Sequence, residues 1–250
     1  MLIKIINPNT TVTMTEAMAE CARRVAAANT RILAASPESG PVSIESHYDE
    51  MLSTPGLLDE IRLGEEDGCD GYVVACFGDP GLQAARELAR GPVIGIAEAA
   101  MHAASMLGTG FSVVTTLART RGMAWHLAER YGMRRFCRNV RAVEIPVLAL
   151  EEERSKVFDA ILGECAKALA EDDADVLVLG CAGMAGLAHD IGEALGVPVI
   201  DGVTVAVKLV EALVSNGLRT SKRGEYAQPL PKRYSGMLAS YGAAESSDPA

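Results

Sequence analysis

Two cysteines with matching surroundings are the residues whose types and spacing suggest chemistry. Cys76 comes after the apolar run 72–75, Cys181 comes after the apolar run 176–179, and each begins a Cys-x-Gly-x-x-Gly motif. In both copies an aspartate stands six residues before the cysteine, and a Pro-Val-Ile follows the motif. The two cysteines lie 105 residues apart. A period of this length is too long for a solenoid repeat and indicates two similar α/β halves with one thiol each.

The predicted position of each thiol favours a reactive role. Around each cysteine the pattern predicts a buried strand, a glycine-containing turn and a helix, over 81–90 in the first copy and 186–195 in the second. The carboxyl end of a strand beside a helix N-terminus is expected to lower a thiol's pKa and to hold an anionic ligand oxygen. A single free cysteine is more often a small apolar core residue. Two cysteines in equivalent turns favour one shared active site.

Other strands and helices must position these turns. The predicted elements of the first half are strands over 3–6, 31–35, 72–75 and 93–96, and helices over 11–28, 57–66 and 81–90. The turn 7–10 ends the first strand, so its polar residues, Asn9 among them, either border the crevice where α/β sheets bind ligands or cap the helix that follows. The loop 36–45 overhangs the same crevice and contains Ile44. We interpret 46–49 as a polar, solvated stretch of loop, in preference to a group of catalytic acids and bases.

The second half repeats this order. Its predicted elements are strands over 111–116, within 140–150, over 176–179 and over 197–200, and helices over 98–107, 121–130, 151–170, 186–195 and 204–216. Thr115 and Thr116 stand where Asn7 and Pro8 stand in the first half. The polar segment 219–236 is expected to wrap back over the first half. We therefore expect a first lobe made of 1–97 with 208–250, and a second lobe made of 98–207.

Composition and charge restrict the class of protein. The chain has 250 residues, 49% of them apolar, with a formal net charge of −10 and a pI near 5.0. An acidic chain without a basic cluster is not expected to bind nucleic acid or an anionic membrane. The sequence shows no signal-peptide pattern and no apolar run of membrane-spanning length, so we expect a cytoplasmic protein.

Cysteine and histidine spacing predicts no metal site. The six cysteines form no Cys-x-x-Cys pair and the four histidines are scattered, so zinc is not expected. Structural disulfides are not expected in a reducing compartment. Nothing marks a particular lysine for Schiff-base formation with pyridoxal phosphate. We therefore expect a reaction without metal or cofactor.

The motifs of this chain together resemble those of the cofactor-independent aspartate/glutamate/hydantoin racemase superfamily, and within it the hydantoin and allantoin racemases. The resemblance covers nearly the whole chain. It rests on Ile6-Asn7-Pro8-Asn9-Thr10, Gly40-Pro41-Val42-Ser43-Ile44-Glu45, Val74-Ala75-Cys76-Phe77-Gly78-Asp79, Phe111-Ser112-Val113-Val114-Thr115-Thr116 and Leu179-Gly180-Cys181-Ala182-Gly183-Met184. It implies an α/β fold of two pseudo-symmetric lobes, each a four-stranded parallel sheet flanked by helices, with the active site in the cleft between them, and a homo-oligomer.

The resemblance also implies roles for individual residues. Members with this pattern use both cysteines, here Cys76 and Cys181, as acid and base on opposite faces of a stereocentre. The implied substrate-binding residues are Asn9, Ile44, Phe77, Gly78, Asp79, Thr115, Thr116, Ala182 and Gly183. Backbone N–H groups of the turns at 77–79 and 182–183 are expected to stabilise an enolate oxygen. No metal ligand is implied.

Departures from the amino-acid racemase branch indicate the substrate. In the amino-acid racemases that this chain resembles, an acidic residue stands where this chain has Asn7. An Asn-Thr pair stands where it has Phe77-Gly78, and a Thr-His pair where it has Ala182-Gly183. The partner for a substrate ammonium group and the helpers of the thiols are therefore missing. A hydantoin ring needs less assistance, because a carbonyl and an acylated nitrogen flank its C5 hydrogen. The expected small-molecule substrate is a 5-monosubstituted hydantoin, allantoin included.

Three alternatives stay open at this point. One is an amino-acid racemase of the aspartate/glutamate type. A second is an arylmalonate-type decarboxylase, although that group keeps a single cysteine. The third is a nucleotide-binding module, because Gly183, Gly186 and Asp201 mimic part of a dinucleotide fingerprint. Against it, a cysteine replaces the first glycine of that fingerprint, and no Walker lysine is present.

Overall fold

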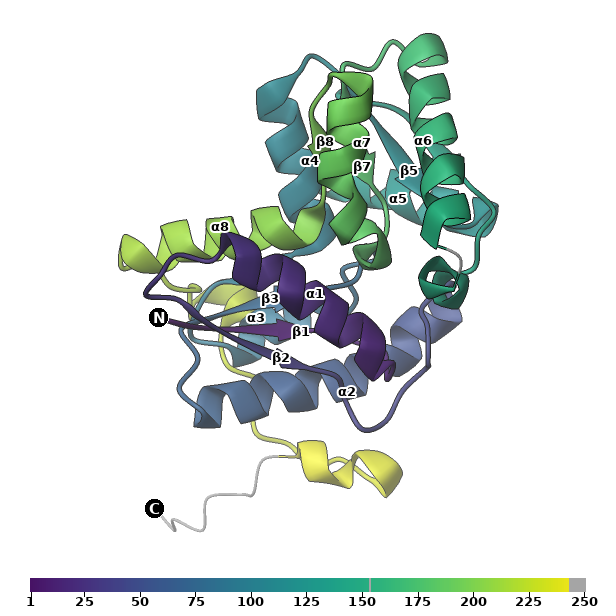
Figure 1. Ribbon diagram of the computed structural model, residues 1–250. Helices are drawn as coiled ribbons and strands as arrows, with labels where there is room; N and C mark the ends of the chain where they lie inside the picture. Colours follow the sequence, from purple (N-terminus) through teal and green to yellow (C-terminus); the bar gives the residue numbers. More distant parts are fainter. Residues whose placement is uncertain (153, 243–250) are drawn as a thin grey trace, which may run out of the picture.

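The computed structural model describes residues 1–152 and 154–242 and places them in two stacked lobes (Figure 1). Each lobe contains one four-stranded parallel sheet, with the strand orders β2-β1-β3-β4 and β6-β5-β7-β8. The first sheet consists of β1 (Leu2–Ile6), β2 (Arg31–Ala35), β3 (Gly71–Val74) and β4 (Val93–Gly95). The second consists of β5 (Phe111–Thr115), β6 (Cys137–Ala142), β7 (Val176–Leu179) and β8 (Val199–Ile200). The orders correspond strand for strand, which confirms the predicted pair of α/β lobes.

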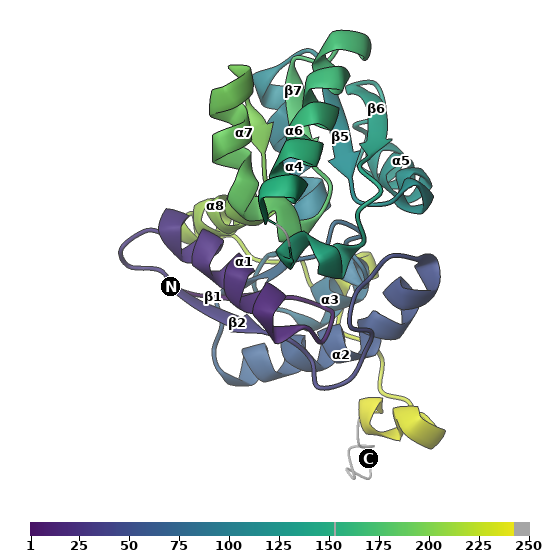
Figure 2. The same ribbon diagram turned by 45° about the vertical axis from the view of Figure 1, so that its right-hand side comes forward.

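Helices cover both faces of each sheet. In Figure 2 the helices of the second lobe, at the top, are seen apart from one another. The first sheet carries α1 (Val12–Val25), α2 (His47–Glu66), α3 (Leu82–Leu88) and α8 (Gly202–Ser215). The second carries α4 (Ile96–Leu107), α5 (Arg121–Arg130), α6 (Arg154–Glu171) and α7 (Ala188–Leu195). The chain returns to the first lobe along α8. The predicted boundary between the two lobes, at residue 208, falls inside this helix. The division into domains stays a prediction.

Side chains that alternate in direction along β3 and β7 separate one central core from two outer cores. Val73 of β3 and Val178 of β7 pack in the same large cluster, which contains residues of both lobes. Their neighbours Tyr72 and Leu177 point to the opposite faces and pack in separate clusters beneath α2 and α6. All residues of β3 and β7 are buried, as expected for parallel strands that helices cover on both faces. The central cluster therefore holds the two sheets in a fixed relation.

The two aspartates of the repeat have a structural role at the opposite end of the sheets from the thiols. Asp70 accepts a hydrogen bond of 2.7 Å from the backbone N–H of Leu2, at the start of β1. Asp175 accepts hydrogen bonds from the N–H groups of Thr109 at 2.9 Å and Gly110 at 3.0 Å, just before β5. Each carboxylate thus ties the beginning of the thiol strand to that of its neighbour.

The largest differences between the predicted and the observed elements concern three of them. The helix expected over 57–66 is α2, which begins at His47, because Ser46 accepts a hydrogen bond from the N–H of Asp49 and caps it. The strand expected within 140–150 is β6, which ends at Ala142. The turn after Cys181 is a 3-10 helix, η3 (Ala182–Leu187), and α7 follows it. The expectation that 46–49 form a loop was therefore wrong.

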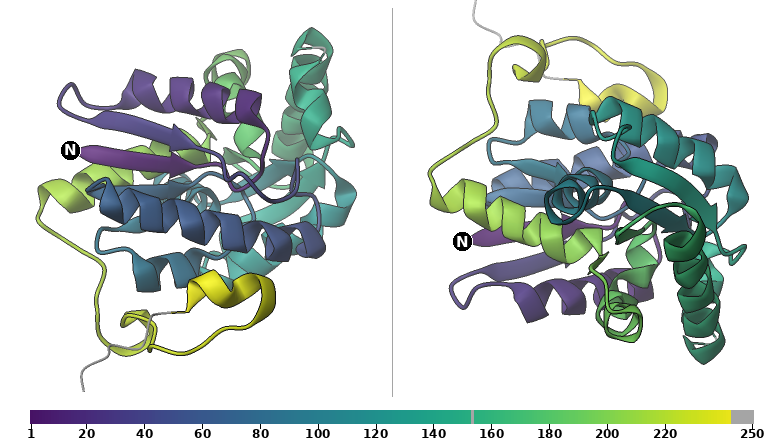
Figure 3. Two further views of the ribbon diagram at one scale, coloured as in Figure 1. Left: turned by 90° about the horizontal axis from the view of Figure 1, so that it is seen from below. Right: turned by 90° about the horizontal axis from the view of Figure 1, so that it is seen from above.

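The segment after α8 runs along the first lobe, as predicted, and lies beside α2 and α3 (Figure 3). Lys222 donates hydrogen bonds to the carbonyl oxygens of Arg86 and Glu87 at 2.6 and 2.8 Å. Tyr241, in a 3-10 turn (Gly236–Tyr241), donates a hydrogen bond of 2.7 Å to Asp59 of α2. The end of the predicted first lobe, 243–250, lies outside the described residues. Among the helices of the described ranges, none has the length and apolar character needed to span a bilayer.

Candidate active site

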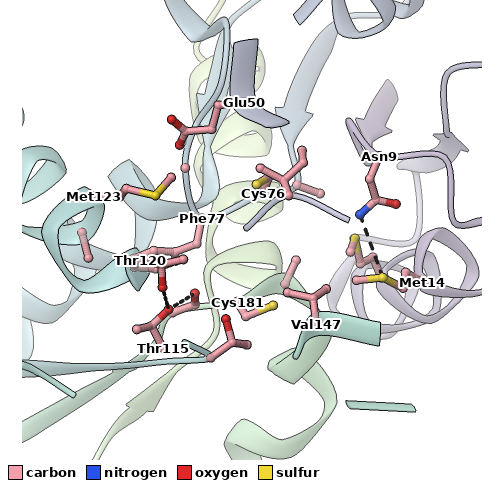
Figure 4. Close-up of a pocket in the computed structure, with 18 residues that line it drawn as sticks. Asn9, Met14, Glu50, Cys76, Phe77, Thr115, Thr120, Met123, Val147 and Cys181 are labelled. Atoms are coloured by element: carbon pink, nitrogen blue, oxygen red, sulfur yellow. Dashed lines mark hydrogen bonds between the residues drawn. The ribbon is translucent and has the colours of Figure 1, made fainter. Parts of the chain in front are cut away.

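The two candidate catalytic thiols occupy equivalent positions at the ends of equivalent strands. Sheet pairing continues one residue past β3 and β7, where Ala75 N–H donates to Ile6 and Gly180 N–H donates to Val114, both at 2.8 Å. Cys76 and Cys181 are the first residues beyond this pairing. Both are half-buried, and both sulfur atoms face one pocket between the lobes (Figure 4).

Residues of both lobes surround this pocket. Its volume, including the part open to solvent, is about 580 Å³. Seven of the residues expected to bind substrate line it: Asn9, Ile44, Phe77, Gly78, Thr115, Thr116 and Ala182. Nine others that line it were not predicted to bind substrate: Met14, Met18, Glu50, Ala75, Thr120, Met123, Ala124, Val147 and Gly180. The structure thus brings residues of both lobes around one cavity.

Both thiols are held as weak acids in this pocket. Burial raises the pKa of Cys76, and the nearby Cys181, Glu50 and Asp79 raise it further. Burial raises the pKa of Cys181 to about 11, and Glu45 adds to the rise. Backbone hydrogen bonds from Gly78 to Cys76 and from Gly183 to Cys181 favour the thiolates but do not offset burial. The predicted lowering of the two pKa values was therefore wrong.

Helix dipoles are too distant to produce the expected lowering. After Cys76, α3 begins only at Leu82 and has seven residues. After Cys181 the chain forms η3, and α7 begins only at Ala188. The dipole effect falls off within one helical turn, so neither sulfur gains much from it.

Asp79 and Gly183, both expected to bind substrate, do not line this pocket. Asp79 is 1% exposed and adopts a positive φ of 45°. Its carboxylate accepts hydrogen bonds from the N–H groups of Ala97 (3.1 Å) and Glu98 (2.9 Å) at the start of α4, and from the hydroxyl of Tyr131 (2.7 Å). Burial raises the pKa of Asp79 to about 7, against the effect of these three donors. Its carboxylate therefore connects the turn of Cys76 to the second lobe.

The amide of Asn9 is oriented by its own turn. Its Oδ1 accepts hydrogen bonds of 2.9 Å from the N–H of Thr11 and from Nδ2 of Asn7. Its Nδ2 has a weak acceptor, Sδ of Met14 at 3.9 Å. This amide N–H₂ group is therefore a donor that a ligand oxygen can engage in place of the thioether.

Thr115 and Thr116 supply hydroxyl groups on the side of the second lobe. Thr115 Oγ1 is 2.9 Å from Oγ1 of Thr120 and donates to the carbonyl of Gly180 at 3.3 Å. Among the described residues, none forms a side-chain hydrogen bond with Thr116, which is 3% exposed and lines the pocket. Thr116 thus has the free hydroxyl of the pair.

Within residues 1–152 and 154–242, no three His, Cys, Asp or Glu side chains are grouped so that they could hold a metal ion. Gly183 and Gly186 lie in the short 3-10 helix η3, which packs against α1 of the first lobe. This turn therefore offers no extended helix N-terminus to bind a dinucleotide.

Comparisons with known proteins agree with this geometry. The sequence model of the Asp/Glu/hydantoin racemase family matches residues 3–210. A hydantoin racemase of Rhizobium meliloti is 50% identical over 236 residues, which are 94% of this chain and 98% of that protein. A hydantoin racemase of Pseudomonas sp. (strain NS671) is 47% identical over 242 residues, which are 97% of each chain.

A solved structure gives the same result for the fold. Allantoin racemase from Klebsiella pneumoniae superposes with a TM-score of 0.94 at 53% identity, covering 96% of this chain and 98% of that one. These matches extend over both lobes and confirm the resemblance of the motifs. The chain therefore belongs to the Asp/Glu/hydantoin racemase family.

Proposed function

We propose that this racemase interconverts the D- and L-enantiomers of 5-monosubstituted hydantoins, allantoin included, with two thiols as acid and base. The observation that carries the proposal is the arrangement of Cys76 and Cys181, one from each lobe, around one pocket. Relatives named hydantoin racemase and allantoin racemase support the choice of substrate. The reaction is an isomerisation, so nothing is oxidised or transferred to a cofactor.

The mechanism needs a thiolate on one face of C5 and a thiol on the other. One thiolate removes the C5 proton, and the electron pair passes to the adjacent carbonyl to give a planar enolate. The opposite thiol then donates its proton to the other face of C5, and it becomes the thiolate. For the other enantiomer the two cysteines exchange roles. Two equivalent turns from two lobes supply this pair.

The enolate oxygen needs hydrogen-bond donors that are not already engaged. Gly78 and Gly183, whose N–H groups were expected to help, donate to the two sulfur atoms. No described residue accepts a hydrogen bond from the N–H of Phe77 or of Ala182, and both residues line the pocket. We propose these two N–H groups, with Nδ2 of Asn9, as the donors to the substrate oxygens.

The polarity of the pocket favours a neutral ring over an amino acid. Among the described residues that line the pocket, none is Lys or Arg, so a substrate carboxylate would lack a charged partner. Aspartate and glutamate bring such carboxylates, and a malonate brings two, so each would lack a cationic partner in this pocket. A hydantoin brings no carboxylate, and its two carbonyl groups match N–H and hydroxyl donors. The pocket therefore favours the hydantoin over both enzyme alternatives.

Single substitutions of the thiols test the proposal. Cys76→Ser and Cys181→Ser are each expected to abolish net racemisation, because a serine hydroxyl is too weakly acidic to replace a thiol. In deuterium oxide, each variant is expected to exchange the C5 hydrogen of one enantiomer without inverting it. Chiral chromatography and mass spectrometry measure the two processes separately.

Background exchange is measured with the double variant and subtracted, since hydantoins racemise slowly without enzyme. Cys69→Ser serves as the matched control, because this buried thiol lies outside the pocket. If either single variant racemises at near the wild-type rate, the two-thiol mechanism is wrong.

Location and assembly are further parts of the proposal. We propose a cytoplasmic enzyme, which six cysteines without a disulfide fit. We also propose a homo-oligomer, supported by exposed apolar side chains such as Tyr48 and Met51 on α2 and Met237 in the C-terminal segment. The acidic net charge argues against nucleic acid or an anionic membrane as a partner. Light scattering of the purified protein measures the number of subunits.

A further inference from the structure

One carboxylate lines the pocket without a role in the two-thiol reaction. Glu50 lies in the first turn of α2, and its side chain is 18% exposed. Figure 4 shows it at the opposite end of the pocket from Val147, beyond Cys76. Among the described residues lining the pocket it is the one that carries a carboxylate. The thiols aside, it therefore sets the charge that a bound substrate meets.

The carboxylate of Glu50 is held in a fixed place. Its Oε2 lies 3.1 Å from Nδ1 of His47, and its Oε1 rests against the backbone of Gly78. A Cβ atom added at Gly78 would lie 2.3 Å from that Oε1, so glycine at this position makes room for the carboxylate. No described residue donates a hydrogen bond to Oε1. Glu50 thus presents an ordered acceptor beside the turn of Cys76.

Opposing effects act on the ionisation of Glu50. His47 and Arg130 favour the carboxylate, and so does the first turn of a helix. Burial has the larger effect and raises the pKa of Glu50. A charge in such a poorly solvated place interacts strongly with other charges and with N–H donors.

We propose that Glu50 selects the substrate: its Oε1 accepts a hydrogen bond from a urea-type N–H, and its charge excludes hydantoins whose C5 substituent is anionic. The inference rests on the proposed hydantoin racemase function. Hydantoins carry such N–H donors in the ring, and allantoin carries more in its ureido substituent. A substituent carboxylate would meet a like charge and no Lys or Arg among the described lining residues.

A pair of substrates of nearly equal shape tests the exclusion. For 5-(carbamoylmethyl)hydantoin and 5-(carboxymethyl)hydantoin, the wild type is expected to prefer the neutral compound by about tenfold or more in kcat/KM at pH 7. Glu50→Gln keeps the shape of the side chain but removes its charge. This variant is expected to reduce the preference by about tenfold. Glu66→Gln, a change of an exposed residue on the same helix, is expected to leave the preference unchanged.

A second variant tests the hydrogen bond. Glu50→Ala removes the acceptor, and KM is expected to rise about tenfold or more with a smaller change in kcat, as for a hydrogen bond to a charged group. A rise for both 5-methylhydantoin and allantoin assigns the bond to the ring, and a rise for allantoin alone assigns it to the ureido group. An unchanged preference in Glu50→Gln, or an unchanged KM for both substrates in Glu50→Ala, would overturn the proposal. If the wild type racemises none of the four hydantoins, the proposed function fails instead.

Discussion

Glu45 and Val147 join the two lobes beside the pocket, where Oε1 of Glu45 accepts a hydrogen bond of 2.7 Å from the N–H of Val147. Glu45 follows Ile44 in a loop of the first lobe, and Val147 begins a 3-10 helix (Val147–Glu151) of the second lobe. Ile44 and Val147 both line the pocket. The hydrogen bond therefore holds the loop over the thiols, and the charge of Glu45 raises the pKa of Cys181.

Two substitutions of Glu45 are expected to separate these effects. Glu45→Ala removes the bond to Val147, and KM is expected to rise about tenfold, because the loop is no longer held over the substrate. Glu45→Gln keeps an acceptor for the bond but removes the charge, so the pH profile of kcat/KM is expected to move to lower pH. Steady-state racemisation at several pH values measures both. Glu38→Gln, at an exposed position of the same loop, is the control, and equal effects of all three variants would contradict the expectation.

The dependence of activity on pH follows from the raised pKa values of the thiols. Catalysis needs one thiolate, and burial raises the pKa of Cys76 and raises that of Cys181 to about 11. Below these pKa values the thiolate fraction grows about tenfold for each pH unit. We therefore expect kcat/KM to rise steeply from pH 7 to pH 9, after subtraction of the uncatalysed rate. A profile that is flat from pH 6 upwards would show that substrate binding or another group sets the thiolate fraction.

The part of the site that lies on the sheets was predictable from the sequence, and the part that lies on α2 was not. Apolar runs before Cys76 and Cys181 indicate parallel strands, whose carboxyl ends meet ligands, and this predicts the thiols and their neighbours. Pro55 lies inside α2, so the pattern places the start of that helix too late and hides Glu50. The sequence does contain a signal for this helix start, because Ser46 is followed three and four residues later by the acidic Asp49 and Glu50.

Electrostatics was the other part that the sequence did not predict. The raised pKa values of the two thiols come from burial between the lobes, which depends on the packing of both sheets. Asp79 lies inside the first thiol motif and therefore resembles a ligand residue, but its positive φ turns it toward α4 and Tyr131. Contacts between residues 52 positions apart, like this one, leave no periodic pattern in the sequence.

Alkylation is expected to distinguish the two pocket thiols from the other four. Cys76 and Cys181 are half-buried and open to the pocket, whereas Cys21, Cys69, Cys137 and Cys165 are buried. Iodoacetamide at pH 8.5 is therefore expected to modify a pocket cysteine first and to inactivate the enzyme in step with that modification. Peptide mapping by mass spectrometry identifies the modified residue. A saturating hydantoin is expected to slow the reaction, and earlier labelling of any buried cysteine would contradict the described accessibility.

The hydrogen bond between Tyr131 and Asp79 is expected to make a pH-dependent contribution to stability. Asp79 has a pKa of about 7 in the folded protein and an ordinary value of 3.8, so the folded form binds this proton more tightly. The stability that Asp79 contributes is therefore present below about pH 4 and is lost as the pH rises through about 7. Tyr131 donates to the carboxylate and limits this loss.

Tyr131→Phe removes that donor, so the pKa of Asp79 is expected to rise further. At pH 8 the ionised carboxylate loses a hydrogen bond, and the variant is expected to lose about 1.5–3 kcal/mol of unfolding free energy. At pH 5 the carboxyl is protonated, and the expected loss is only about 1 kcal/mol. Urea unfolding at the two pH values measures the difference. Tyr48→Phe, at a position 74% exposed, is the control, and an equal loss for Tyr131→Phe at both pH values would show that Asp79 does not titrate in this range.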